Sequence, residues 1–321
     1  MAEDRLSQLP DDILHLILDK IGIFQAVETA ILSERWKKLW RSLPALRFHF
    51  SLPKDSYLSP CEHNRSQVLS HCHRVSRFLS RRDASAAVRA FHLSFRSNNA
   101  SAAAHVLDLS LGINSHLDGG VESSFVEDCA RYAIHHGVRS LHLHCHDLRQ
   151  TWLPAEIFAC KTLKELDLRD FIVNHKELDL PELEKLTLLK YLVLVPLVIN
   201  APKLRLLKLY GRIAVERIHA PLLTSLTYKS SDAWECADAD LPVLEHVYLD
   251  IHKSRYCRDQ NHTNFLAMLH QLRNATTVSL TLDTIKVEHS PNLLVIADED
   301  DMAEEGYDFV VYEDGYEYGN A

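Results

Sequence analysis

Histidine is the residue type whose spacing in this chain most suggests the chemistry of a site. The sequence has 20 histidines, and His142, His144 and His146 alternate with Leu143 and Cys145. Alternate side chains of a β-strand share one face, so these three imidazoles would point the same way, as binding to one zinc ion requires. Nothing else at ligand spacing completes the site. We therefore predict the polar face of a strand here, with no metal and no other cofactor.

A second group of candidate ligands combines cysteines with histidines. His71, Cys72 and His73 follow Cys61 and His63, but the apolar spacing of residues 66–80 indicates a helix. Consecutive side chains of a helix point in directions about 100° apart. His71, Cys72 and His73 therefore cannot all bind the same ion. The chain has seven cysteines, an odd number, with no C-x-x-C pair, which indicates free thiols rather than a disulfide framework.

The sequence shows neither the motifs of common enzymes nor the segments of membrane proteins. It has only nine glycines, no glycine-rich phosphate loop and no G-x-S-x-G elbow, and its carboxylates are scattered. We predict no catalytic residues and no enzyme; a repeat-domain enzyme or metal protein is the least favoured hypothesis. No apolar signal core and no run of 18 apolar residues occurs, so we expect a cytoplasmic or nuclear location without a membrane partner.

Charge gives little indication of a charged partner for the folded part. The net charge is −9, but residues 298–321 carry ten acidic residues and no lysine or arginine. The remainder is therefore nearly neutral and shows no basic stripe, which argues against a nucleic-acid partner. The acidic segment is most simply a disordered, solvated tail.

The elements that must position any site are repeats. From Pro181 the unit Pro-x-Leu-x-x-Leu-x-Leu recurs, with small variations, at Pro202, Pro221 and Pro242, at spacings of 21, 19 and 21 residues. This period predicts a leucine-rich repeat, in which short strands stack into a parallel sheet. Related units without the proline are Val138/Leu141/Leu143, Leu163/Leu166/Leu168 and Val278/Leu280/Leu282, and Val88/Phe91/Leu93 is the candidate first unit.

The length of each repeat predicts what lies behind its strand. Repeats of 19–21 residues leave no room for a full helix, so we expect the convex side to be mostly turns. Longer gaps can hold helices. We predict helices over 66–80, from a capping box at Ser124 to Gly137, and after Thr263.

Residues that flank the inward leucines should line the concave face of the stack, a common binding surface. The candidates for binding a protein target are His142, His144, Asp167, Arg169, Lys208, Tyr210, Thr227, Lys229, His246 and Tyr248. The same face should include Glu165, Lys185, Thr187, Ser225, Asp250, Ser279 and Thr281. Any solvated sheet face has a similar composition, so the face as a whole is a stronger candidate than any single residue.

The first fifty residues predict three short helices. Pro10, followed by two aspartates, suits a helix start, an apolar stripe continues to Ile21, and Gly22 suits a stop. Ser33 can cap a third helix that carries Trp36 and Trp40. So small a module usually needs a partner or a neighbouring domain to bury its apolar surface.

These fifty residues resemble the F-box of plant proteins. The resemblance lies in Asp4–Leu14, Ala26–Trp40 and Leu43–Phe48, about 45 residues in register. It implies a module that docks a Skp-type adaptor and, through it, a cullin and a RING subunit. Carried over residue by residue, the adaptor contacts are Leu9, Pro10, Ile13, Leu14, Ile17, Val27, Leu39 and Trp40.

The repeat region is similar to plant F-box/leucine-rich-repeat proteins, through Phe78–Ser85, Ala133–Val138 and Leu153–Leu163. It looks FBD-like, although a clear C-terminal FBD domain is missing. The resemblance implies a substrate-recognition subunit of an SCF-type ubiquitin ligase, whose repeats bind an unknown target protein for ubiquitination and proteasomal degradation. A non-catalytic interaction scaffold outside any ligase is the alternative.

The expected fold class is α/β, with a three-helix F-box followed by a leucine-rich-repeat solenoid. We place the F-box at 1–50, a linker and packing helix at 51–87, the repeats at 88–297 and the acidic tail at 298–321.

Overall fold

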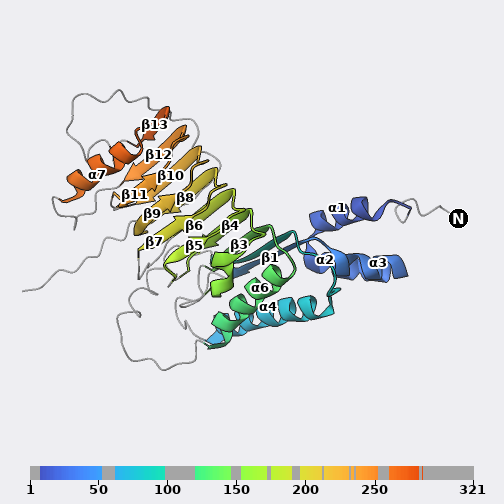
Figure 1. Ribbon diagram of the computed structural model, residues 1–321. Helices are drawn as coiled ribbons and strands as arrows, with labels where there is room; N and C mark the ends of the chain where they lie inside the picture. Colours follow the sequence, from blue (N-terminus) through green and yellow to red (C-terminus); the bar gives the residue numbers. More distant parts are fainter. Residues whose placement is uncertain are drawn as a thin grey trace, which may run out of the picture.

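Two layered parallel sheets form the body of the molecule, and a small group of helices is attached at one end (Figure 1). The structure is a computed structural model that describes residues 8–52, 62–97, 120–145, 153–171, 175–189, 196–211, 213–230, 233–234, 236–251, 260–281 and 284. The predicted acidic tail, most of the predicted linker, His146 and Leu282 lie outside the described residues.

The helical module at the N-terminal end has the predicted helices. They are α1 (Asp11–Ile21), α2 (Ile23–Glu28), η1 (Thr29–Ile31), α3 (Glu34–Leu39) and η2 (Trp40–Ser42). Gly22 separates α1 from α2 with a φ of 85°, a conformation that glycine adopts without a side-chain clash. Ser33 Oγ accepts a hydrogen bond from the Trp36 amide at 3.4 Å, which confirms it as the N-cap of α3.

Nine parallel strands form the larger sheet, here called the long sheet. They are β1 (Ala45–Leu52), β2 (Ala90–Ser97), β3 (Ser140–Cys145), β4 (Glu165–Arg169), β6 (Lys185–Leu189), β8 (Leu206–Tyr210), β10 (Ser225–Ser230), β12 (His246–Ile251) and β13 (Thr277–Leu280), in that spatial order. From β4 to β12, residues in register recur every 19 to 21 positions. The predicted leucine-rich-repeat stack is confirmed.

The long sheet begins earlier than the sequence indicated. β1 pairs with β2 from Ala45 opposite Ala90 to Leu52 opposite Ser97, so the unit at Val88–Leu93 is the second strand rather than the first. The signal was the alternation of Leu46, Phe48 and Phe50, all three of which are buried. β1 thus starts inside the range that we assigned to the helical module.

A second, four-stranded sheet lies behind the short repeats, where mostly turns were expected. This short sheet comprises β5 (Glu177–Asp179), β7 (Leu197–Asn200), β9 (Val215–His219) and β11 (Asp238–Asp240), paired in parallel in that order. Leu178, Ile199 and Ile218 from its strands are buried in the same core as the long sheet. Three to five residues per repeat suffice for a strand, although they are too few for a helix.

Helices replace the short strands where repeats are longer. They are α4 (Glu62–Arg81), α6 (Gly120–His135), η3 (Ala155–Ala159) and α7 (Gln260–Gln271). α6 contacts η3, and η3 contacts β5, so helices and short strands make one layer. α6 begins before Ser124, which places the predicted capping residue inside the helix, and α7 likewise begins before Thr263. Gly137, at a φ of 73°, follows the end of α6.

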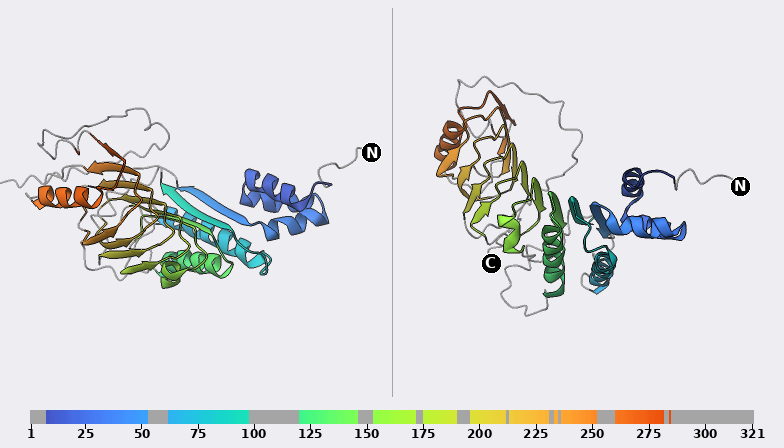
Figure 2. Two further views of the ribbon diagram at one scale, coloured as in Figure 1. Left: turned by 45° about the horizontal axis from the view of Figure 1, so that its top comes forward. Right: turned by 45° about the vertical axis from the view of Figure 1, so that its right-hand side comes forward.

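The helical module is joined to the repeats by aromatic packing. Trp40 lies 5.3 Å from Phe78 of α4, and Phe78 lies 5.6 Å from Phe48 of β1, measured between ring centroids. Phe24 of α2 lies 6.0 Å from Phe48. Figure 2 shows the module projecting from the β1 end of the sheet, while α7 lies at the opposite end.

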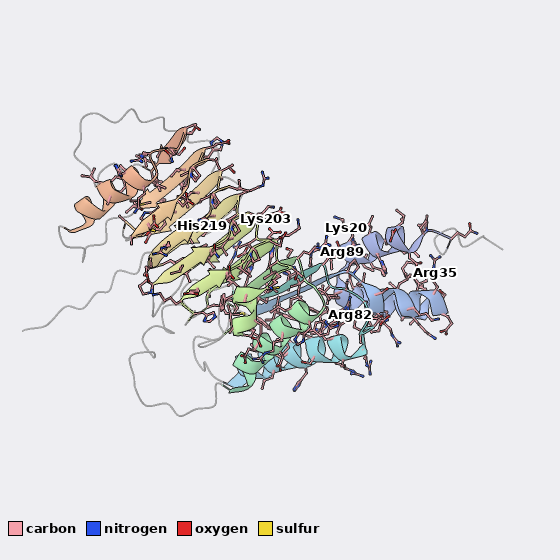
Figure 3. All side chains as sticks on the ribbon, in the orientation of Figure 1. Lys20, Arg35, Arg82, Arg89, Lys203 and His219 are labelled. Atoms are coloured by element: carbon pink, nitrogen blue, oxygen red, sulfur yellow. The ribbon has the colours of Figure 1, made fainter. Side chains whose placement is uncertain are left out.

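One buried arginine crosses the same junction. The guanidinium of Arg82 donates to the carbonyls of Leu43, Ala86 and Ala87 at 2.7, 3.1 and 3.1 Å, and to the Tyr132 hydroxyl at 3.0 Å. Figure 3 labels this side chain beside the helices. Arg82 therefore connects the end of the module, the loop after α4, and α6.

Among the described helices, none is both long and apolar enough to cross a lipid bilayer. The described cysteines are free thiols, as the sequence indicated, and burial raises the pKa of Cys129 and of Cys145 well above the usual value.

Candidate functional site

The first helix has two apolar faces. Leu14 and Leu18 are fully buried in the module's core. Ile13 and Leu16 are 42% and 61% exposed, and with the half-buried Ile17 they lie along a different stripe of the same helix. Exposed apolar residues that adjoin one another are typical of interaction sites, so this second stripe is a candidate docking surface.

The residues predicted to contact an adaptor divide by their exposure. Pro10 and Ile13 are exposed, and Leu9, Ile17 and Val27 are half-buried. Leu14, Leu39 and Trp40 are at most 5% exposed, so they support the surface from within the module rather than form it.

Three exposed apolar residues were missed by the sequence analysis. Leu16, Ile31 and Leu32 have exposed fractions of 61%, 89% and 59%. The predicted stripe ran from Ile13 to Ile21 without Leu16, and the structure divides it into a buried side and an exposed side. The signal for Leu16 was its position three residues after Ile13, on the same side of the helix. Ile31 and Leu32 lie at the end of η1, where a helical pattern no longer predicts burial.

Polar contacts hold α1 in place. Arg35 of α3 donates to the Leu9 carbonyl at 2.6 Å and, through Nε, to Asp11 Oδ1 at 3.1 Å. His15 Nε2 lies 3.2 Å from the Leu39 carbonyl. Arg47 of β1 forms an ion pair with Asp19. The exposed stripe is therefore presented in a fixed orientation relative to the sheet (Arg35 and Lys20 are labelled in Figure 3).

The outward side chains of the long sheet form two adjacent rows, together called here the long-sheet face. The first row is His92, His142, Asp167, Thr187, Lys208, Thr227, Tyr248 and Ser279, and the second is Ser94, His144, Arg169, Leu189, Tyr210, Lys229 and Asp250, each in register with the next. The structure therefore brings nine of the ten predicted target-binding residues into two rows. The tenth, His246, lies in the neighbouring register position, opposite Ser225.

A family model described as the F-box domain matches residues 6–48. An F-box/LRR-repeat protein of Arabidopsis thaliana is 27% identical over 172 residues, 53% of this chain and 45% of the relative. A second F-box/LRR-repeat protein of that plant is 29% identical over 190 residues, 58% of this chain and 44% of the relative. The chain therefore contains an F-box domain and is similar to plant F-box/leucine-rich-repeat proteins.

The similarity to F-box/LRR proteins has clear limits. An F-box/FBD/LRR-repeat protein of Arabidopsis thaliana is 40% identical over 73 residues, 17% of this chain and 16% of the relative. The chain spans less than half the length of these curated relatives. No solved structure matches the chain.

The long-sheet face carries charged side chains on β4, next to the histidines of β3. Arg169 donates two hydrogen bonds to Asp167, from Nε to Oδ1 at 2.9 Å and from a terminal guanidinium nitrogen to Oδ2 at 2.8 Å. His144 Nε2 lies 3.3 Å from Asp167 Oδ2, close enough for a hydrogen bond but not aligned for one.

His144 and Arg169 also determine the ionisation of the Asp167 carboxyl group. Burial by itself raises the pKa of Asp167, but contact with His144 and Arg169 lowers it by more, to well below its usual range. Burial, together with the charges of Arg169 and His142, lowers the pKa of His144 more than its contact with Asp167 raises it. The group is therefore a carboxylate paired with a guanidinium, beside a neutral imidazole.

Further along the long-sheet face, a lysine lies between two tyrosines. Lys229 Nζ is 5.2 Å from the Tyr248 ring centroid and 5.9 Å from that of Tyr210, distances at which a cation is attracted to an aromatic ring. Asp250 Oδ2 lies 3.9 Å from Lys229 Nζ. Burial, followed by the charge of Asp250, raises the pKa of Tyr248. Aromatic and charged side chains of this kind commonly anchor protein interfaces.

The histidines that cluster in the structure differ from the three that the sequence grouped together. His142 and His144 do share the long-sheet face, but their neighbour in the described residues is His92 of β2, which the sequence analysis did not single out; His146 lies outside the described residues. The signal for His92 was available, because it sits between the inward Phe91 and Leu93. In the second group of candidate ligands, which the sequence argued against, Cys72 is buried within α4.

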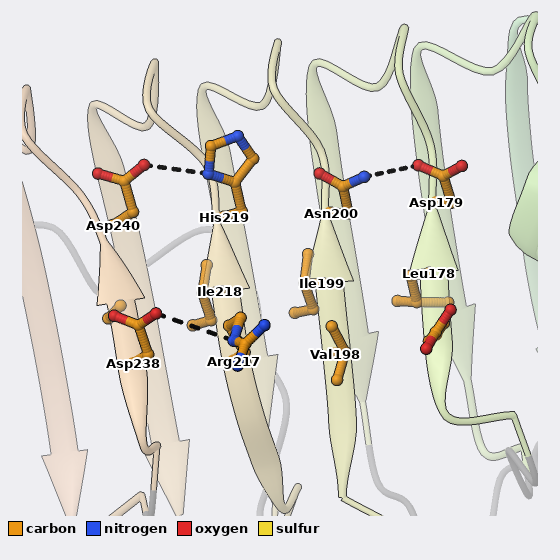
Figure 4. A pocket seen from close by; sticks show the side chains of 12 residues that line it. Leu178, Asp179, Val198, Ile199, Asn200, Arg217, Ile218, His219, Asp238 and Asp240 are labelled. Carbon is orange, nitrogen blue, oxygen red and sulfur yellow. Dashed lines mark hydrogen bonds and ion pairs between the residues drawn. The ribbon is translucent and has the colours of Figure 1, made fainter.

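The outer side of the short sheet forms a groove (Figure 4). Its upper row runs from Asp179 through Asn200 and His219 to Asp240. Asn200 Nδ2 donates to Asp179 Oδ1 at 2.8 Å, and His219 Nδ1 lies 3.0 Å from Asp240 Oδ2. These exposed polar pairs satisfy one another across neighbouring repeats, which is the behaviour of a solvated sheet face.

Proposed function

We propose that this F-box/LRR chain is the substrate-recognition subunit of an SCF-type ubiquitin ligase. Its F-box would dock a Skp-type adaptor, and its long-sheet face would bind a target protein for ubiquitination and proteasomal degradation. The observation that carries the proposal is the uncovered apolar stripe of α1, which lies inside the matched F-box residues.

The stripe has the properties expected of an adaptor surface. Leu16 and Ile13 point away from the core that Leu14 and Leu18 fill, and the helix is held by Arg35 and His15. A preorganised apolar surface binds well because little conformational entropy is lost on association. The charged residues near it, Asp12 and Lys20, fit the polar rim of an interface.

The long-sheet face has the properties expected of a target surface. It runs without interruption across neighbouring strands, and it combines an aromatic–cation group around Lys229 with the paired charges of Asp167 and Arg169. Fixed charges of both signs favour a partner with a complementary pattern, and therefore specificity.

In this proposal the chain performs no chemistry. It would hold a target close to a ubiquitin-charged enzyme, and thereby raise the effective concentration of the target's lysines. The rigid junction between module and repeats suits that task, because a fixed spacing restricts which surfaces can meet.

The adaptor half of the proposal is tested by removing the stripe. In the full chain, changing Ile13 and Leu16 together to alanine should weaken binding to a purified Skp-type adaptor at least tenfold, since truncated interface anchors cost about 1–4 kcal/mol each. Isothermal titration calorimetry measures the change. Leu222→Ala, which removes an exposed leucine from the repeats, is the matched control and should bind like the parent chain. Equal affinity of the double variant and the parent would rule out this docking surface.

A second experiment separates a ligase subunit from a scaffold. The chain, an adaptor, a cullin and a RING subunit are mixed with a ubiquitin-charged enzyme and with proteins that co-purify with the chain. Ubiquitination of a co-purifying protein that disappears with Lys229→Glu, but persists with Lys203→Glu in a turn away from the long-sheet face, supports target recognition by that face. Assembly with the adaptor but not with the cullin would support the scaffold.

A further inference from the structure

Three histidines converge at the end of the long-sheet face that lies nearest to the F-box. His92 extends from β2, and His142 and His144 extend from β3. Each offers a ring nitrogen, and these three nitrogens all lie within 4.8 Å of one another. The ring centroid of His92 is 5.2 Å from that of His142 and 4.8 Å from that of His144.

We infer that His92, His142 and His144 form a binding site for a divalent cation of the zinc class, with a coordination position left open toward the long-sheet face. This inference does not depend on the proposed ligase function.

The ligand set suits zinc. Three imidazoles with a fourth, exchangeable position make a common tetrahedral zinc site, with Zn–N distances of about 2.0–2.1 Å. In such a tetrahedron the nitrogens are about 3.4 Å apart. The imidazoles must rotate to close from separations of up to 4.8 Å to that geometry, and the partial exposure of His142 and His144 leaves room for such rotation.

One nitrogen of the cluster lacks a partner that a metal could supply. His92 Nε2 is buried and has no hydrogen-bond partner among the described residues, which is costly for a polar atom. A bound cation would give this buried nitrogen a partner.

Carboxylates of β4 are placed to support the ligands. His142 Nε2 lies 3.6 Å from Glu165 Oε1 and 3.0 Å from Ser140 Oγ, and Asp167 lies beside His144. In metal sites a carboxylate commonly accepts a hydrogen bond from the imidazole nitrogen that is not the ligand, and so orients the ring. Glu165 would also compensate part of the charge of the cation, whereas the charge of Asp167 is already paired with Arg169.

The sequence pattern explains how the site is built. Register pairs His92 with His142, and His144 follows two positions later on the same strand, on the same face. His49 of β1 packs edge-on against His92, with centroids 4.4 Å apart, and shields it on the other side. Histidines from three consecutive strands therefore gather at one place, although they lie far apart in the sequence.

The test is metal binding by the tag-free full chain after removal of metal with a chelator. Calorimetric titration with Zn²⁺ should give one saturable site per chain, and Co²⁺ should give the visible absorption bands of a tetrahedral ion. His142→Gln and His92→Gln should each weaken Zn²⁺ binding at least tenfold. His246→Gln changes a histidine of the same sheet that lies on β12, away from the cluster, and should bind like the parent chain.

The folding control and the binding results together decide whether the three histidines hold the metal. Circular dichroism checks that each variant is folded; if His92→Gln is not, the partly exposed His142 decides alone. Glu165→Gln should leave one site with about 10–100-fold lower affinity. Absence of saturable binding in the parent chain would overturn the inference. So would zinc binding that survives both histidine substitutions, since the metal would then be held elsewhere.

Discussion

Leu14 and Leu16 show at the scale of single residues how one helix serves two purposes. They are the same residue type, two positions apart in α1, yet Leu14 is fully buried and Leu16 is 61% exposed. A difference between their substitutions therefore reports on environment and not on chemistry or helix propensity.

We expect Leu14→Ala to lower the free energy of unfolding by about 2–5 kcal/mol, because it leaves a cavity in the core. Leu16→Ala should change it by less than about 0.5 kcal/mol, as for most surface positions. Chemical denaturation followed by tryptophan fluorescence measures both values. Equal destabilisation by the two variants would mean that Leu16 is packed against the chain, and so unavailable to an adaptor.

Single residues also mark where sequence analysis succeeds and where it stops. The alternation of Leu141, His142, Leu143 and His144 was enough to predict which side chains face outward. It did not give His92 as their neighbour, because that contact depends on how β2 and β3 are aligned. Trp40 was expected to contribute partly to the adaptor interface, but it packs on Phe78; a spacing rule gives the face of a helix, but not what lies opposite.

At the scale of elements, repeat length determines what packs behind each long-sheet strand. The repeats between β4 and β12 are short and hold β5, β7, β9 and β11, whereas longer ones hold α4, α6 and α7. The helices were predictable from their apolar spacing. The short strands were not, because three residues such as Glu177–Asp179 carry too little alternation to be recognised alone. Only one pattern could have indicated these strands, namely the apolar residue that recurs three positions before each repeat proline.

Arg82 is the element-scale feature with the clearest consequence for stability. Arg82→Ala would leave the buried carbonyl of Leu43 and the partly buried carbonyls of Ala86 and Ala87 without this donor. Unsatisfied buried groups are costly, so we expect the free energy of unfolding to fall by about 2–4 kcal/mol. Arg82→Lys should recover little, since an ammonium cannot reproduce the planar fork of donors.

The neighbouring arginine provides the control for this measurement. Arg81 is exposed at the end of α4, so Arg81→Ala should unfold within about 0.5 kcal/mol of the parent chain. Thermal unfolding of the three variants side by side measures the difference. If Arg82→Ala unfolds like Arg81→Ala, the guanidinium does not hold the junction together.

At the scale of the whole molecule, the F-box and the repeats share one core. Buried apolar residues run without a break from Leu14 of α1 to Leu272 beyond α7, and Phe24, Trp40, Phe48 and Phe78 lie where the two parts meet. Such packing argues against a flexible tether. An adaptor docked on α1 and a target on the long sheet would be held at a fixed separation.

This shared core leads to a prediction about the isolated F-box. A fragment of residues 1–52 keeps β1 but loses its partner β2, and it exposes Phe48 and Trp40, which α4 and β2 cover in the full chain. Little apolar surface can then be buried, and domains this small are marginal. We expect the fragment alone to be largely unfolded, with the red-shifted emission of solvated tryptophans and no cooperative thermal transition.

Adaptor binding should rescue that fragment, because a ligand that binds only the folded form shifts the equilibrium toward it. Circular dichroism of the mixture should show more helix than the sum of its parts, while the Ile13→Ala, Leu16→Ala double variant of the same fragment should gain much less. A fragment that melts cooperatively by itself would show that the F-box is an independent unit. Its orientation relative to the repeats would then no longer follow from a common core, and the fixed separation of adaptor and target would lose its physical basis.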